Sequence, residues 1–176
     1  RDLSKRLIYC VLYGGGAKKT GSIIAPKESE HKQYEKGKQT IDTFYQNLPA
    51  IKKLKDQVES TLSNRDYLIG IDGRHLQIRS KHSALNQLLQ STGAITVKKA
   101  TTILYDDMTD KGLKFFKDWG FVAHVHDEYQ CLLRPEYTDL FQELAIDSFR
   151  KSGEYFNLKC PLTGEAKIGK NWCETH

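Results

Sequence analysis

The repeat of apolar residues over the first third of the chain is that of α-helices. Over residues 1–24 and 41–63, apolar side chains recur every three or four positions, which gathers them on one face of a helix, whereas residues 28–40 are mostly polar. The repeat is interrupted at Gly14-Gly15-Gly16, at Pro26 and at Asn47-Leu48-Pro49, where glycine and proline disfavour regular structure. The pattern therefore predicts four helices, over residues 1–13, 17–24, 28–47 and 49–63.

The next segments predict a hairpin and a long helix. Apolar residues flank Asp72-Gly73 within residues 67–78, and an Asp-Gly pair in that setting is typical of a hairpin closed by a type I′ turn. Residues 80–110 then carry the longest helical repeat in the chain, and we expect the Ser80 side chain to cap its amino end. A small ribbon and the longest helix thus follow the helical first part.

The last third of the chain predicts strands packed on helices. Two apolar runs, residues 121–125 and 129–133, flank the charged tip His126-Asp127-Glu128, which indicates an antiparallel pair. We expect an amphipathic helix over residues 135–156 and one more strand over residues 164–169. The fold class that follows is α+β, with a helical lobe packed on an antiparallel sheet that carries a β-hairpin.

The first predicted helix has an unusual polar face. Arg1, Lys5, Tyr9 and Tyr13 are each four positions apart and so form one stripe of two cations followed by two aromatic rings. The opposite side carries apolar residues that can dock on the rest of the protein, namely Leu3, Leu7, Cys10 and Val11. Such a helix suits a ligand that is anionic at one end and flat at the other, as a nucleotide is.

Composition adds little to this picture. The net charge of +5 and the pI near 8.9 are compatible with a polyanionic partner. The four cysteines, at positions 10, 131, 160 and 173, form no CxxC pair, so we expect reduced thiols and a cytoplasmic location. No apolar run approaches the roughly 20 residues that span a bilayer, and no signal peptide is visible, so no membrane role is expected.

The Asp127-Glu128 tip is the strongest candidate for chemistry. Adjacent carboxylates at the apex of a hairpin point into solvent, where divalent cations can reach them. Phosphoryl transfer uses such carboxylates to hold metal ions between the attacking hydroxyl and the leaving phosphate. A competing interpretation is a zinc or iron site, because His124, His126 and Glu128 alternate and would share one face of a strand.

Four motifs follow one another in the chain. They are Arg1-x3-Lys5-x3-Tyr9-x3-Tyr13-Gly14, the segment 80–91, Val125-His126-Asp127-Glu128, and the ending Gly169-x2-Trp172 with its terminal His176. Together they resemble family A (polymerase I-type) DNA polymerases, whose fingers helix, minor-groove helix, metal-binding hairpin and carboxy terminus carry similar motifs. The Tyr-Gly-Gly-Gly continuation of the first motif resembles the phage-replicase branch of that family.

The resemblance implies template-directed DNA synthesis and assigns a role to each residue. In the incoming dNTP, Lys5 and Arg1 would hold the triphosphate, and Tyr9 would lie against the base and sugar. On the primer-template DNA, Tyr13 and Gly14 would border the templating base. His82, Asn86 and Gln90 would contact base edges in the minor groove, and His126 would also bind DNA. Asp127, with Glu128 nearby, would bind the pair of Mg²⁺ ions, and Asp127, Glu128 and Lys5 are the expected catalytic residues.

The same resemblance covers only the back half of a polymerase, with residues 1–70 as a portion of the fingers and 71–176 as a portion of the palm. A second metal-binding aspartate, the thumb and a partner strand for the palm sheet would lie in a missing amino-terminal portion, in cis or as a separate chain. We therefore expect negligible catalysis from this chain alone. We expect the protein to be located in the cytoplasm, or in the host cytoplasm if the source is viral.

The alternative function is that of a non-catalytic nucleotide- or nucleic-acid-binding module, or of a subunit of a split polymerase. In the preferred interpretation, the cations of the first helix lie over the acidic hairpin tip, with room for a dNTP between them.

Overall fold

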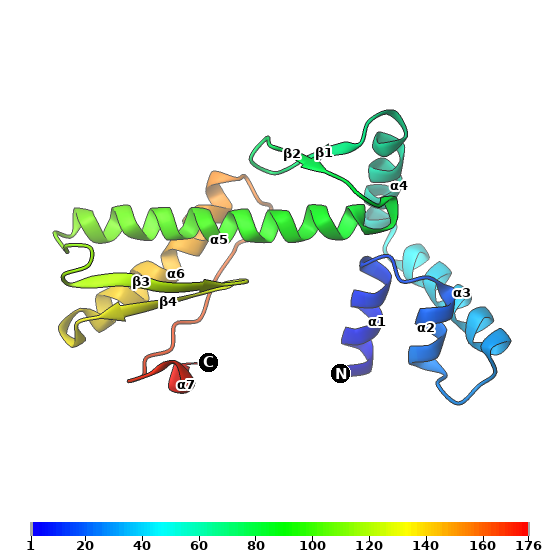
Figure 1. Ribbon diagram of the computed structural model, residues 1–176, viewed down its shortest axis with the longest axis horizontal. Helices are drawn as coiled ribbons and strands as arrows, with labels where there is room; N and C mark the ends of the chain where they lie inside the picture. Colours follow the sequence, from blue (N-terminus) through cyan, green and yellow to red (C-terminus); the bar gives the residue numbers. More distant parts are fainter. Residues whose placement is uncertain (1, 176) are drawn as a thin grey trace. The chain divides into compact units, whose positions relative to one another are not determined.

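The computed structural model describes residues 2–175 of the chain (Figure 1). It forms two compact units that meet between Gln90 and Ser91, inside the long helix α5 (Ala84–Asp110), and each unit is described by itself. It is a mixed fold of helices and small antiparallel sheets, which confirms the expected α+β class. The assignment of residues 1–70 to fingers and 71–176 to a palm stays a prediction.

The first unit opens with the four predicted helices. They are α1 (Asp2–Leu12), α2 (Ala17–Ile24), α3 (Glu30–Asn47) and α4 (Pro49–Asn64). Helix α4 has Pro49 in its first turn, where proline's missing N–H costs no hydrogen bond. The glycine and proline breaks in the sequence thus mark the helix ends correctly.

Helices α2 and α3 lie side by side because glycines let their backbones touch (Figure 1). A Cβ atom on Gly21 would overlap the backbone carbonyl of Gln33, and one on Gly37 would overlap that of Ala17. Two glycines on facing helices therefore hold this part of the first unit together at a distance that no larger residue allows.

The hairpin of the first unit pairs β1 (Tyr67–Ile69) with β2 (His75–Gln77). The predicted type I′ turn is wrong, because five residues, 70–74, connect the strands and Gly73 alone among them has a positive φ, of 82°. A two-residue turn at Asp72-Gly73 would shift the pairing by one position. The observed register pairs Leu68 with Leu76, so both side chains point to one face, towards the buried cluster of α4 and α5.

Helix α5 begins later than predicted. Residues 81–83 form a 3₁₀ turn, and the α-helix starts at Ala84, which is completely buried. The Ser80 side chain caps neither element, and it is the Ser80 backbone carbonyl that accepts hydrogen bonds from the N–H and hydroxyl of Ser83. The expectation of a Ser80 side-chain cap was therefore wrong.

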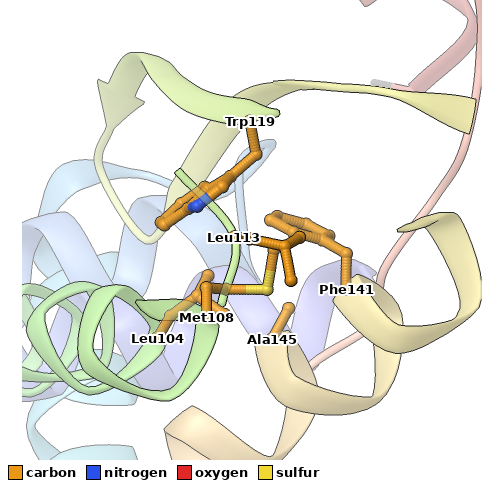
Figure 2. Close-up of a cluster of buried hydrophobic side chains, with 6 residues drawn as sticks. All are labelled: Leu104, Met108, Leu113, Trp119, Phe141 and Ala145. Atoms are coloured by element: carbon orange, nitrogen blue, oxygen red, sulfur yellow. The ribbon is translucent and has the colours of Figure 1, made fainter. Parts of the chain in front are cut away.

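The second unit packs the hairpin of β3 (Trp119–Val125) and β4 (Glu128–Leu133) against α5 and α6 (Thr138–Tyr155), and a 3₁₀ turn over Pro135–Tyr137 leads into α6. Figure 2 shows the core between them, in which six buried side chains meet: Leu104, Met108, Leu113, Trp119, Phe141 and Ala145. Val122 is an extra residue in β3, because Phe121 pairs with Cys131 and Ala123 with Gln130. This bulge lies five residues before Asp127 of the acidic tip.

The tail of the chain differs from the prediction. Residues 164–169 form no strand, and the backbone carbonyl of Ala166 accepts a 3.1 Å hydrogen bond from the Gln142 side chain on α6 instead of a strand partner. A short helix, α7 (Trp172–Thr175), closes the described chain. All four cysteines are free, as expected. Within residues 2–175, no helix has the length and apolar character to cross a membrane.

Candidate nucleotide and nucleic-acid interface

The polar face of α1 carries an exposed cation beside a pair of stacked rings. Tyr9 and Tyr13 stack with their ring centroids 5.5 Å apart, and 44% and 43% of their surfaces are exposed. The Lys5 ammonium lies 5.9 Å from the centroid of Tyr9, a cation–π distance. Arg1, the other predicted cation, lies outside the described residues. Lys5, Tyr9 and Tyr13 therefore form one accessible stripe, as the spacing predicts.

The apolar face of α1 docks over only part of its length. Cys10 and Val11 are buried, and the Cys10 thiol lies 3.7 Å from the Thr20 hydroxyl on α2. Leu3 was expected on the docked face but is 50% exposed. The buried residues of α1, Cys10 and Val11, lie only in its last turn. The carboxy-terminal end of α1 is thus packed against the rest of the first unit, and the exposed Tyr13 follows directly after it.

Gly14 ends α1 and brings it against the 3₁₀ turn that precedes α5. Its φ of 80° is the left-handed conformation of a helix C-terminus, where the N–H groups of Gly14 and Gly15 bond to the carbonyls of Val11 and Cys10. A Cβ atom on Gly14 would overlap the backbone carbonyl of His82. Two predicted DNA-binding positions, distant in sequence, are therefore in backbone contact within the first unit.

The three polar residues predicted to share a face near the start of α5 differ in exposure. His82 and Gln90 are exposed, so both are accessible to a ligand. Asn86 is half-buried, and its side-chain oxygen is enclosed without a hydrogen-bond partner among the described residues. An amide turned partly inward leaves His82 and Gln90 as the accessible groups of this face.

The β3–β4 turn presents Asp127 to solvent. Val125 pairs with Glu128, so the connection consists of His126 and Asp127 alone. His126 has a φ of 54°, a backbone conformation that residues other than glycine rarely adopt. Asp127 is exposed. Asp127 forms no hydrogen bond or ion pair with any described residue, which leaves its carboxylate available to a cation.

Glu128 is oriented by residues that the sequence reasoning missed. Its carboxylate accepts a 2.7 Å hydrogen bond from the side-chain Nε2 of Gln130, and the side-chain Oε1 of Gln130 accepts one of 3.2 Å from the Thr175 hydroxyl on α7. The alternation of a strand puts Gln130 on the same face as Glu128, a signal that was present in the sequence. No local sequence pattern predicts that Thr175 contacts this strand, because the two lie far apart in the sequence.

The alternative zinc or iron site is not formed. His124 pairs with Tyr129 and the next pair joins Val125 to Glu128, so the side chains of His124 and Glu128 lie on opposite faces of the hairpin. His126 lies in the turn rather than on the strand. Within residues 2–175, no three His, Cys, Asp or Glu side chains gather as a metal site would need. Asp127 and Glu128 can thus supply two carboxylates to a metal, but not a complete set of ligands.

Two titratable groups near the acidic tip, Tyr129 and Cys131, are half-buried on the core side of β4. Burial raises the pKa of Tyr129 to about 12 and that of Cys131 to about 12. Both groups are therefore neutral at physiological pH. They pack against the core and do not take part in the acidic tip.

Comparison with known proteins identifies the family. The model of DNA polymerase family A matches residues 1–174. This chain belongs to DNA polymerase family A. It is 35% identical over its whole length to the DNA-directed DNA polymerases of Enterobacteria phage T3 and Escherichia phage T7, and it spans 27% of the length of each. It is also 24% identical, over 98% of its length, to DNA polymerase I of Aquifex aeolicus.

A solved family A structure shares the fold. The polymerase domain of Pol1 from M. smegmatis, in complex with DNA primer-template and dNTP, superposes on 86% of this chain with a TM-score of 0.73 at 18% identity. The matched part is 27% of that longer chain. The family A chain described here is therefore about a quarter of the length of the relatives it matches.

Proposed function

We propose that this chain takes part in template-directed DNA synthesis, as the carboxy-terminal portion of a replicative DNA-directed DNA polymerase. The observation that carries the proposal is the contact of Gly14 with His82, because it joins the stripe of α1 to the polar face of α5 within one unit. A nucleotide bound to the stripe of α1 and a base pair bound to the polar face at the start of α5 would then be neighbours. Both phage relatives are named DNA-directed DNA polymerases.

In this proposal α1 binds the incoming dNTP. Lys5, with Arg1 four residues earlier in the sequence, binds the triphosphate as a cation, and the exposed ring of Tyr9 lies against the base and sugar. Tyr13 and Gly14 border the templating base at the end of the same helix. The exposed stack of two rings supports these roles, because it offers a flat surface beside a positive charge.

The 3₁₀ turn over Lys81–Ser83 and the start of α5 read the base pair just formed. Gln90 and His82 are exposed and can donate to purine N3 or pyrimidine O2, acceptors that every correct base pair presents in the minor groove. Asn86 joins them if its amide turns outward, and His126 contacts DNA beside the acidic tip. Binding of this kind selects correct pairing without selecting a sequence, as replication requires.

The chemical step transfers a nucleotidyl group. The primer 3′-oxygen forms a bond to the α-phosphorus, the bond from that phosphorus to the bridging oxygen of the β-phosphate breaks, and pyrophosphate leaves while the hydroxyl proton passes to solvent. Family A DNA polymerases generally use divalent metal ions, and a pair of Mg²⁺ ions would neutralise the charge that develops on the phosphates. Asp127 would hold both ions, with Glu128 in support, and the remaining ligands would come from outside this chain.

The partner that completes the site is the portion of a family A polymerase that this chain does not match. An exposed apolar surface on the second unit supports a docking role for that portion. Phe116, Val122 and Leu132 are 82%, 60% and 70% exposed, beside a groove of about 410 Å³ formed by residues 116–122 and 132–135. The assembled enzyme would act in the cytoplasm, or in the host cytoplasm if the source is viral.

The second candidate function is binding without catalysis, as a nucleotide- or nucleic-acid-binding module or a subunit of a split polymerase. The presence of only two carboxylates at the hairpin tip of the described chain favours it. Primer extension separates the two, with this chain alone and with a polypeptide that supplies the upstream part of a family A polymerase. Synthesis by the mixture supports the proposal, and tight primer-template binding without synthesis in the mixture supports the alternative.

A further inference from the structure

The outward face of the β1–β2 hairpin carries exposed planar side chains that the proposed polymerase site does not use. Leu68 and Leu76 point to the core of the first unit, so the alternate positions Tyr67, Ile69 and His75 point away from it. His75 is exposed, Tyr67 is half-buried, and Ile69 is 43% exposed. A ribbon that needed only to cover the core would be expected to carry polar, flexible side chains on this face.

These planar groups are already stacked. The rings of Tyr67 and His75 lie 4.1 Å apart at an angle of 21°, and the guanidinium carbon of Arg65 lies 4.7 Å from the centroid of Tyr67. We name Arg65, Tyr67 and His75 the ribbon stack. Two of its members, Arg65 and His75, are exposed, so a further flat group can reach the stack from solvent.

The charge around the ribbon stack is positive. Between residues 65 and 81 there are four cations, Arg65, Arg74, Arg79 and Lys81, and two carboxylates. Both carboxylates are engaged, since Asp72 pairs with Arg74 at 2.6 Å and Asp66 accepts a hydrogen bond from Gln77. Arg79 and Lys81 are exposed and form no ion pair with a described residue. A polyanion that approaches the ribbon thus meets cations that are free to bind it.

We propose that the ribbon stack binds an unpaired nucleic-acid strand, with a base extending the stack and its phosphates lying along Arg65, Arg79 and Lys81. Single-stranded nucleic acids are held in this way elsewhere, by aromatic platforms in a positive groove. Base pairs inside a duplex cannot use the site, because both of their faces are already covered by stacking on neighbouring pairs. The inference goes beyond the proposed function, since it adds a second binding site and requires no synthesis.

The test measures binding of a fluorescein-labelled oligothymidylate to the full chain by fluorescence anisotropy. His75→Leu and Tyr67→Leu keep apolar volume but remove the flat rings, and each should weaken binding about ten-fold. Tyr45→Leu is the matched control, because it removes another half-buried ring that carries a cation, Lys55 at 5.3 Å, from the same unit. It should leave the affinity unchanged. Circular dichroism checks that each variant is folded, and His75 is exposed enough for its variant to fold normally.

Two further measurements complete the test. Arg65→Gln should reduce the slope of log affinity against log salt by about 0.7, the value for one phosphate contact on a single strand. Unchanged oligothymidylate affinity in folded His75→Leu would overturn the proposal and leave the stack as a brace for the ribbon. Competition by poly-glutamate as strong as that by oligothymidylate would also overturn it. Because no synthesis is measured, failure here is distinct from failure of the polymerase proposal, which primer extension tests.

Discussion

The backbone of Gly14 lies directly against the backbone carbonyl of His82, with no room for a Cβ atom between them. Gly14 follows the helix that carries Lys5 and Tyr9, one residue after Tyr13, and His82 lies in the turn that leads to Gln90. The two surfaces proposed to bind a nucleotide and a base pair are therefore fixed to each other through backbone atoms. Side-chain substitutions on either surface should leave this contact intact.

Gly14→Ala should lower the free energy of unfolding by more than the roughly 1–2 kcal/mol that a left-handed alanine costs, because the new methyl also overlaps the His82 carbonyl. Gly112→Ala is the matched control. Gly112 ends α5 with nearly the same φ, 83°, and the same pair of backbone hydrogen bonds, but a Cβ there meets open space. Urea unfolding of both variants measures the difference, and equal losses would contradict the close contact.

Tyr9 should control selection of the sugar in the reconstituted enzyme. Its hydroxyl can replace the contact that is lost when the incoming nucleotide has no 3′-OH, so we expect weak discrimination against dideoxynucleotides. Tyr9→Phe should increase that discrimination about ten-fold or more, the equivalent of one charge-assisted hydrogen bond. The measurement is the ratio of kcat/KM for dNTP and ddNTP in single-nucleotide extension. Unchanged selectivity in Tyr9→Phe would remove the proposed role of the hydroxyl.

The apolar surface of the second unit should be needed for assembly with the missing portion of the polymerase. Leu132→Asp places a charge where we expect a buried contact, and it should weaken the complex with the upstream polypeptide about 30-fold or more. The isolated chain should stay folded, since this side chain is 70% exposed. Ile168→Asp is the control, because Ile168 is 52% exposed in the same unit but lies outside the groove. Equal binding of the two variants in a sedimentation assay would contradict the docking surface.

The four cysteines should react with a thiol reagent in two groups. Reaction requires the thiolate, and burial holds the pKa of Cys131 at about 12, so this thiol stays protonated at pH 8. Cys10 is buried against Thr20, whereas Cys160 and Cys173 are exposed. Labelling at pH 8 followed by peptide mass spectrometry should find Cys160 and Cys173 modified first. Early labelling of Cys131 would show that the core of the second unit opens readily.

Local signals in the sequence predicted most of the helices but not the hairpin turn. The glycines and prolines that bound α2 and α4 act on their immediate neighbours, so their effect can be read without the fold. Asp72-Gly73 is also a local signal, but the register was decided by burial of Leu68 and Leu76 together. The side-chain cap at Ser80 failed for a related reason, since the α-helix starts only where Ala84 enters the core.

The candidate site was predictable to a similar degree. The stripe of α1 follows from its four-residue spacing, and the exposed Asp127 follows from its place between two apolar runs. The contact of Gly14 with His82 and the hydrogen bond from Thr175 to Gln130 join residues far apart in the sequence, for which no periodic pattern exists. The partly inward orientation of the Asn86 side chain also depends on residues that pack against it, which no periodic pattern identifies.

The central claim is that Asp127 belongs to a polymerase active site that is completed by the remaining portion of a family A polymerase, in cis or as a separate chain. The most direct measurement is primer extension by this chain mixed with the upstream part of a family A polymerase, comparing the unmodified chain with Asp127→Asn. We predict synthesis by the mixture only, and a loss of about a thousand-fold in Asp127→Asn, because a metal site contributes several kcal/mol to the transition state. Synthesis at an undiminished rate by Asp127→Asn would contradict the account.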